Sequence, residues 1–199
     1  ILGYVLSSNL ALADGHEAAE VAIADPAEIS FVFNTLLFCI GGFLVMWMAA
    51  GFTMLEAGLV RGKNTVVICI KNLGLFSIAG LAYYLIGYNL MYAGVDGGYI
   101  GSISIWSSGV GSADDLVGQG YSPASDWFFQ MVFVATTASI VSGALAERIL
   151  IYPFFAFIVV LTAILYPISG SWQWGGGWLS EMGFSDFAGS TIVHSVGGW

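Results

Sequence analysis

The sequence predicts an all-α integral membrane protein, and two observations lead to this fold class. The 199 residues are 58% hydrophobic and only 9% charged, whereas soluble domains average about 25% charged residues. Long stretches of the chain carry no Asp, Glu, Lys or Arg, and they reach the roughly 20 residues that cross a bilayer core. So few charges could not cover a soluble surface, and the 15% aromatic content argues against disorder.

The uncharged stretches place the expected helices. The last one begins near Phe187 and reaches only Trp199, too few residues for a complete span, so we expect a piece of a larger protein. The uncharged stretches are 31–55, 72–93, 127–146, 149–180 and 187–199. The expected helices cover about residues 31–57, 66–92, 124–147, 150–169 and 187–199.

Local signals agree with two of these helix starts. Asp25 is a suitable N-cap, and Pro26 follows it at a first helical position with Glu28 in the first turn. The pair Ser122 and Pro123 repeats the device before the third expected helix. Both signals indicate helices that begin close to the uncharged stretches.

The basic residues predict the orientation in the cell membrane. Arg61, Lys63 and Lys71 surround the first link between helices, and Arg148 lies between the third and fourth. By the positive-inside rule these links are cytoplasmic, so the N-terminus and the entry to the fifth helix lie outside. We expect Lys71 to snorkel from its helix toward water, and Glu147 to pair locally with Arg148.

We divide the chain into an exterior N-terminal segment, residues 1–30, and a partial membrane domain, residues 31–199. Residues 1–13 end in Ala11-Leu12-Ala13, which is typical of a signal-peptide cleavage site. Two interpretations stay open: the remnant of a signal peptide, or a short exterior extension.

Several classes of function are disfavoured by composition. Four basic residues against 13 acidic ones cannot form a surface that binds nucleic acid. No His, Cys, Asp or Glu cluster has the spacing of a metal site, and no cofactor fingerprint is present. We therefore expect no metal, no cofactor and no enzymatic activity, and a lipid bilayer as the surrounding partner.

His194 is the residue most indicative of function. It lies eight residues beyond Asp186, about 12 Å along a helix, which places it near the middle of the membrane. Ionisable residues at that depth usually mark transport or proton paths. The alternative is a packing histidine bonded to a neighbouring helix.

Four further residues complete the candidate set. We expect Asp186 to cap the fifth helix, a role compatible with attracting a cation at the outer mouth. Trp174 lies beside a run of three glycines and could present its ring to a cation, although tryptophans at an interface usually form an aromatic belt. Phe129 and Phe133 are i, i+4 neighbours on a helix rich in small residues, which favours a central helix with both rings facing inward.

These residues lie in motifs that resemble the ammonium transporter family (Amt/Mep/Rh), and Trp174 favours the Amt branch. The matching stretches run in the family's order from about residue 31 to Trp199, with Ser190 where a glycine is frequent. They are Glu56-Ala57-Gly58-Leu59-Val60-Arg61-Gly62-Lys63-Asn64, Gly143-Ala144-Leu145-Ala146-Glu147-Arg148-Ile149, Trp174-Gly175-Gly176-Gly177 and Asp186-Phe187-Ala188-Gly189-Ser190-Thr191-Ile192-Val193-His194.

The resemblance implies a homotrimer of eleven-helix protomers built from two inverted repeats, of which this chain would hold most of the first. It implies an outer vestibule that binds ammonium through Trp174, Phe129 and Asp186, a gate at Phe133, and His194 as the first of two pore histidines. It also implies ammonia as the conducted species, methylammonium as a further ligand, and a cytoplasmic regulatory protein as a partner. An ammonium sensor, or a transporter fused to a signalling domain, and an electroneutral Rh-like gas channel stay open as alternatives.

Overall fold

The computed structural model describes residues 25–109 and 112–199, and within them it is helical without strands. Four helical stretches are long and apolar enough to cross a membrane: Pro26–Leu59, Gly62–Tyr92, Pro123–Ala144 and Ile151–Ser171. The predicted all-helical membrane fold is therefore confirmed. Residues 1–13, with the proposed cleavage site, lie outside the described residues.

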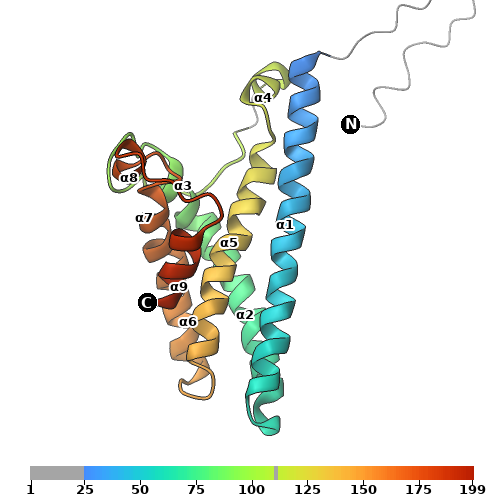
Figure 1. Ribbon diagram of the computed structural model, residues 1–199, viewed down its shortest axis with the longest axis vertical. Coiled ribbons are helices and arrows are strands. Elements are labelled where there is room, and N and C mark those ends of the chain that lie inside the picture. Colours follow the sequence, from blue (N-terminus) through green and yellow to red (C-terminus); the bar gives the residue numbers. More distant parts are fainter. Residues whose placement is uncertain (1–24, 110–111) are drawn as a thin grey trace, which may run out of the picture.

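The first stretch is α1 (Pro26–Leu59), and it begins at Pro26 rather than near residue 31. The Asp25 side chain accepts a hydrogen bond from the Ala27 backbone N–H at 3.0 Å, which confirms the predicted N-cap. With 34 residues α1 is about 51 Å long, more than the roughly 30 Å of a hydrocarbon core. Its first turns lie beside the short helix α4 (Ala113–Gln119), which the sequence did not predict (Figure 1).

The second and fourth stretches each contain a turn of π-helix. The second runs through η1 (Gly62–Asn64), α2 (Thr65–Ala82), the π-turn η2 (Tyr83–Gly87) and α3 (Tyr88–Tyr92). The fourth runs through α6 (Ile151–Val160), the π-turn η3 (Leu161–Leu165) and α7 (Tyr166–Ser171). The two π-turns pack against each other, so each widens its helix at the same level.

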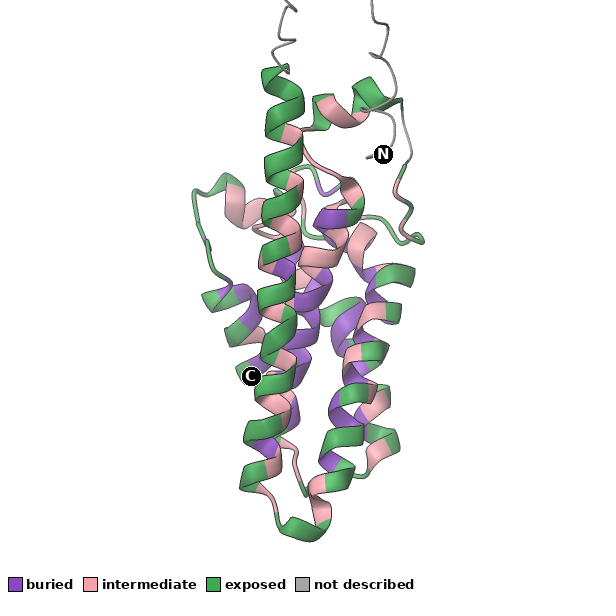
Figure 2. Cartoon of the chain, turned by 90° about the vertical axis from the view of Figure 1, so that its right-hand side faces the viewer, coloured by how far each residue is buried: buried purple, intermediate pink, exposed green. Residues whose placement is uncertain are grey.

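α5 (Pro123–Ala144) is the central helix of the bundle. It packs against α1, α2 and the C-terminal elements, and it is the most buried of the four long stretches, whereas α1 is the least (Figures 1 and 2). The prediction of a central third helix is therefore confirmed. The outward side of α1 is apolar, with Phe33, Leu37 and Trp47 exposed, as expected of a surface that faces lipid.

The C-terminal part contains less helix than predicted. After α8 (Trp178–Glu181), residues 187–189 are not helical, and the expected fifth helix begins only with the π-turn η4 (Ser190–Ser195) followed by α9 (Val196–Gly198). The late start follows from Gly189, which has a left-handed φ of 82°. α9 ends partway along α5 and α6 (Figure 1).

Candidate functional site

A cavity of about 420 Å³ lies at the N-terminal end of α5, and it contains three of the predicted site residues, Phe129, Phe133 and Trp174. We call it the aromatic cavity. Its walls come from α3, from α5 and from the loops around Tyr121, Trp174 and Phe187. The residues that line it are Tyr88, Tyr92, Tyr121, Asp126, Phe129, Gln130, Phe133, Trp174 and Phe187.

The helical period of α5 places its cavity residues on one face. Asp126, Phe129, Gln130 and Phe133 stand at i, i+3, i+4 and i+7, which are neighbours on a helix surface. The rings of Phe129 and Phe133 meet edge to face with centroids 5.0 Å apart. The predicted stacking of the two phenylalanines is therefore present, and both rings border the same space.

Trp174 closes the cavity from the loop after α7. Its indole Nε1 donates a hydrogen bond of 2.6 Å to the backbone carbonyl of Asp186, and its ring lies 6.1 Å from that of Phe133. Two glycines permit this arrangement. A Cβ on Gly175 would lie 2.1 Å from the Met91 carbonyl oxygen, and one on Gly189 would lie 3.2 Å from the Trp174 ring.

Asp186 is a buried capping residue and is not among the residues that line the aromatic cavity. Its carboxylate accepts four backbone N–H bonds of 2.8–3.0 Å, from Gly189, Ser190, Thr191 and Ile192. Burial raises the pKa of this carboxyl, but the four hydrogen bonds outweigh it and hold the pKa below its usual value. The predicted capping role is confirmed, while the predicted role in attracting a cation stays a prediction.

Sequence reasoning missed two polar residues of the aromatic cavity. Asp126 is buried, and its carboxylate accepts a hydrogen bond from the Tyr88 hydroxyl. The side-chain oxygen of Gln130 is buried and has no hydrogen-bond partner among the described residues. Asp126 and Gln130 are i, i+4 neighbours on the same helix face as Phe129 and Phe133. This spacing could have identified them from the sequence.

His194 lies on η4, and the residues that the structure describes leave it exposed. It is not among the residues of the aromatic cavity. The neighbouring Val193 carbonyl accepts a hydrogen bond of 3.3 Å from the Thr137 hydroxyl, and Gly197 packs against Ile140, so η4 and α9 are docked on α5. The backbone that carries His194 is thus fixed, and its pore-lining role stays a prediction.

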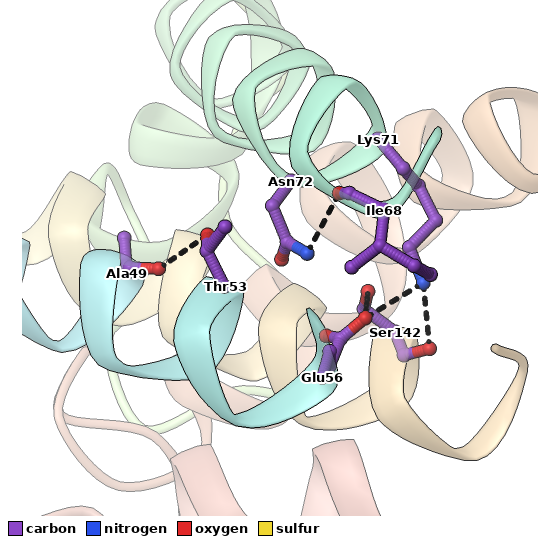
Figure 3. Close-up of polar contacts among 7 residues, drawn as sticks. All are labelled: Ala49, Thr53, Glu56, Ile68, Lys71, Asn72 and Ser142. Atoms are coloured by element: carbon purple, nitrogen blue, oxygen red, sulfur yellow. Dashed lines mark hydrogen bonds and ion pairs between the residues drawn. The ribbon is translucent and has the colours of Figure 1, made fainter. Parts of the chain in front are cut away.

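A second polar group, which we call the ion-pair cluster, consists of Glu56, Lys71 and Ser142 at the other end of α5 (Figure 3). The ammonium of Lys71 lies 2.9 Å from Glu56 Oε2 and also donates to the Ser142 carbonyl at 2.9 Å. The Ser142 hydroxyl donates to the same Glu56 oxygen at 3.0 Å. The prediction that Lys71 snorkels to water is therefore wrong, because a carboxylate on α1 satisfies it inside the bundle.

The predicted pair of Glu147 and Arg148 is also wrong. Glu147 accepts hydrogen bonds from the backbone and side chain of Arg61 and from the Asn64 side chain, while Arg148 donates to the Ala144 carbonyl. Glu147 has a left-handed φ of 61°, which turns it away from its sequence neighbour. These bonds, with that from Asn64 foremost, lower the pKa of the Glu147 carboxyl.

No group of three or more His, Cys, Asp or Glu side chains that could hold a metal ion occurs among residues 25–109 and 112–199.

Four membrane-length helices, with α5 at the centre of the other three, define a multi-pass α-helical membrane protein. Comparison with known families is more specific, because the model of the Ammonium Transporter Family matches residues 36–199. The chain belongs to the ammonium transporter family. The resemblance drawn from the motifs is thereby confirmed.

Individual relatives agree with this assignment. A putative ammonium transporter of Synechocystis sp. is 45% identical over 200 residues, covering 98% of this chain and 44% of the relative. Ammonium transporter Amt2 of Archaeoglobus fulgidus is 42% identical, covering 86% of this chain and 37% of the relative. The chain thus spans less than half the length of these relatives.

Solved structures support the truncated ammonium transporter fold. A structure described as a sensor Amt protein superposes with a TM-score of 0.78 at 36% identity, covering 86% of this chain and 43% of that one. A mutant of Candida albicans Mep2 superposes with a TM-score of 0.69 at 24% identity, covering 85% of this chain and 38% of that one, a likeness that concerns the fold alone.

Proposed function

We propose that the protein containing this chain transports ammonium across the cell membrane, with the aromatic cavity as the entry on the outer side. The observation that carries the proposal is the convergence of Phe129, Phe133 and Trp174 on one cavity that also contains the Asp126 carboxylate. Aromatic faces attract a cation by about 0.5–2 kcal/mol, and a carboxylate adds negative charge and hydrogen-bond acceptors. Membership of the family supports the same substrate.

Selection against potassium follows from the hydrogen-bonding chemistry of the substrate. Ammonium and potassium are monovalent and similar in size, but only ammonium donates N–H bonds. The unpartnered oxygen of Gln130 and the carboxylate of Asp126 are acceptors that suit such a donor. Asp186 contributes here through its backbone carbonyl, which orients the Trp174 ring beside the cation.

Passage beyond Phe133 requires loss of the charge. A charged group at the centre of a bilayer costs about 2.5–3.5 kcal/mol on insertion scales, whereas neutral ammonia crosses far more cheaply. In the proposed sequence ammonium loses a proton near the Phe133 gate, ammonia continues along His194, and the proton crosses separately. A neutral imidazole offers one donor and one acceptor, which suits both ammonia and a proton relay.

Further features of the proposal concern the whole protein. The N-terminus lies outside, the functional unit is a homotrimer, methylammonium is a second substrate, and a cytoplasmic protein regulates the flux. Arg61, Lys63 and Arg148 lie in the links between the long helices, which supports this orientation.

Ammonium sensing is the second candidate function, and the 36% identity to a structure described as a sensor Amt protein favours it over an electroneutral gas channel. A signalling domain encoded after the last helix, together with no uptake in an ammonium-starved host, would favour sensing. Flux of ammonia without current would instead favour a gas channel of the Rh type.

The test uses the full-length protein in proteoliposomes, with ammonium-evoked current and selectivity over potassium as readouts. We expect the change His194→Ala to remove the current or the selectivity, because no neutral donor and acceptor then lines the path. Ser195→Ala, one residue further on η4, is the matched control and should retain both. Unchanged current and selectivity in His194→Ala would show that the relay assignment is wrong.

A further inference from the structure

The ion-pair cluster lies between two cavities. Glu56 lines a cavity of about 570 Å³ between α1 and α5, which we call the α1–α5 cavity, and Lys71 lines a smaller one of about 220 Å³. Arg61, Glu147 and Arg148 also line the α1–α5 cavity, so it lies at the end of the bundle predicted to be cytoplasmic. A buried carboxylate therefore borders a space next to the inner surface.

One oxygen of that carboxylate is unsatisfied. Glu56 is only 3% exposed, and its Oε1 is buried with no hydrogen-bond partner among the described residues. Figure 3 shows the other oxygen bonded to Lys71 and Ser142, and the free one pointing away from Lys71.

The donors of Lys71 are already committed. Its ammonium is bound by Glu56 Oε2 and the Ser142 carbonyl, and it lies 5.1 Å from the centre of the Phe154 ring. Asn72, the next residue, likewise has a buried side-chain oxygen without a partner among the described residues. A buried acceptor left open in this way favours a small donor that can enter and fill it.

The α1–α5 cavity and the aromatic cavity lie along the same face of α5. Phe129 and Phe133 line the aromatic cavity, whereas Ile140 and Ala144 line the α1–α5 cavity. The positions 133, 140 and 144 differ by seven and four, which keeps them on one helix face. From Phe133 to Ala144 the helix rises about 16 Å, and the buried Thr137, which bonds to the Val193 carbonyl, lies between the two cavities.

From this geometry we infer that the free carboxylate oxygen of Glu56 binds ammonium at the predicted cytoplasmic end of α5, an inference that rests on the proposed function. Lys71 neutralises the charge of Glu56, so a bare cation such as potassium gains little there. Ammonium gains an N–H···O bond to an oxygen that otherwise has none. The site thus holds the ion that forms again after ammonia has passed, or the ion that enters from the cytoplasm during efflux.

The decisive variant is Glu56→Asp in the full-length protein. The shorter side chain keeps its charge and can still pair with Lys71, but its carboxylate is withdrawn by about 1.5 Å. Half-saturation by ammonium is measured from each face, in right-side-out and inside-out vesicles. We expect half-saturation from the inner face to rise about tenfold with the outer face unchanged, as for the loss of one charge-assisted hydrogen bond.

Glu147→Asp is the matched control, because Glu147 lines the same cavity but already accepts bonds from Arg61 and Asn64. It should leave both faces unchanged. A charge swap, Glu56→Lys with Lys71→Glu, serves as the second variant: it keeps an ion pair but moves the carboxylate to α2, so inner-face binding should stay weak.

The outcomes separate the inference from the proposed function. Equal half-saturation in wild type and Glu56→Asp, or a rise of the same size from both faces, overturns the inference. Half-saturation from the inner face that equals the wild-type value in the charge-swapped protein overturns the inference as well, because the ion pair would then serve only to hold α1 and α2 together. Absence of ammonium flux in the wild type would overturn the proposed function, and the inference with it.

Discussion

The two ends of α5 each hold a buried carboxylate, but the partners of these carboxylates differ. In the aromatic cavity Asp126 is bonded by the neutral Tyr88 hydroxyl, and no cationic side chain of residues 25–109 and 112–199 pairs with it. In the ion-pair cluster Glu56 is bonded by the cationic Lys71, so the pair is neutral. The comparison teaches that burial and residue type alone do not determine what a carboxylate does, since the charge of its partner decides whether it adds net negative charge to its surroundings.

The partners also differ in where they come from. Tyr88 belongs to α3 and Lys71 to α2, on opposite sides of the π-turn η2, so one helical stretch supplies a neutral donor to one end and a charged donor to the other. The negative potential is therefore concentrated at the aromatic cavity, whereas the opposite end is held together by opposite charges. Each prediction below changes one of these partners or tests one of these carboxylates.

The largest effect is expected for Lys71→Met, which leaves the Glu56 carboxylate buried without a counter-charge. Breaking a buried pair from one side costs about 3–5 kcal/mol, and we expect a loss of that size in the free energy of unfolding of the purified protein. The double variant Glu56→Gln with Lys71→Met should regain most of it, because no buried charge remains. Equal destabilisation in the single and double variants would contradict the role given to the charge.

The sequence predicted the residues of the aromatic cavity much better than those of the ion-pair cluster. Phe129 and Phe133 lie on one helix, so the period of 3.6 predicts their shared face, and the family motif supplied Trp174. Glu56 and Lys71 lie on different helices, and only the packing of α1 against α2 brings them together. No spacing rule within one helix could predict that pair.

Helix boundaries explain the remaining differences between prediction and structure. Asp126 lies in the first turn of α5, which begins at Pro123, and it therefore stands on the same helix face as Phe129 and Phe133 and borders the cavity. The four long helices followed from hydropathy, whereas the π-turns η2, η3 and η4 depend on contacts between helices. The late start of the last helix depends on the left-handed Gly189, which the sequence did not reveal.

The second prediction tests the uncompensated charge directly. Asp126→Asn keeps the shape and the bond with Tyr88 but removes the negative charge from the aromatic cavity. We expect half-saturation by external ammonium to rise about tenfold, since a hydrogen bond to a charged group contributes about 1.5–3 kcal/mol. Asp186→Asn is the control and should change external half-saturation less, because Asp186 does not line the cavity. A larger effect of Asp186→Asn than of Asp126→Asn would indicate that Asp186 supplies the charge that attracts ammonium.

The third prediction concerns Asp186 as a cap. Asp186→Ala leaves four backbone N–H groups without an acceptor, and we expect a loss of about 0.5–2 kcal/mol in the free energy of unfolding. The pKa of Asp186 is lowered in the folded state, so its contribution is complete above the unfolded value of about 3.9 and declines as the pH falls through the lower folded value. Unfolding measured at pH 7 and below pH 4 should therefore show a difference between wild type and variant that shrinks in acid.

The smallest effect is expected for Glu147→Gln, and its salt dependence sharpens the contrast with the buried pair. The side chain of Arg61 is 67% exposed, so water and ions screen its pair with Glu147, whereas Glu56 and Lys71 are shielded from both. The lowered pKa of Glu147 means that its contribution is present above its unfolded value and is lost as the pH falls through the folded one. For Glu147→Gln we expect a small drop in melting temperature at low salt. This drop should disappear in 1 M salt, where charges are screened over about 3 Å, whereas the effect of Lys71→Met should persist at both salt concentrations. If the effect of Lys71→Met also disappeared in salt, its charge would be accessible to water, and the distinction between the two ends of α5 would not hold.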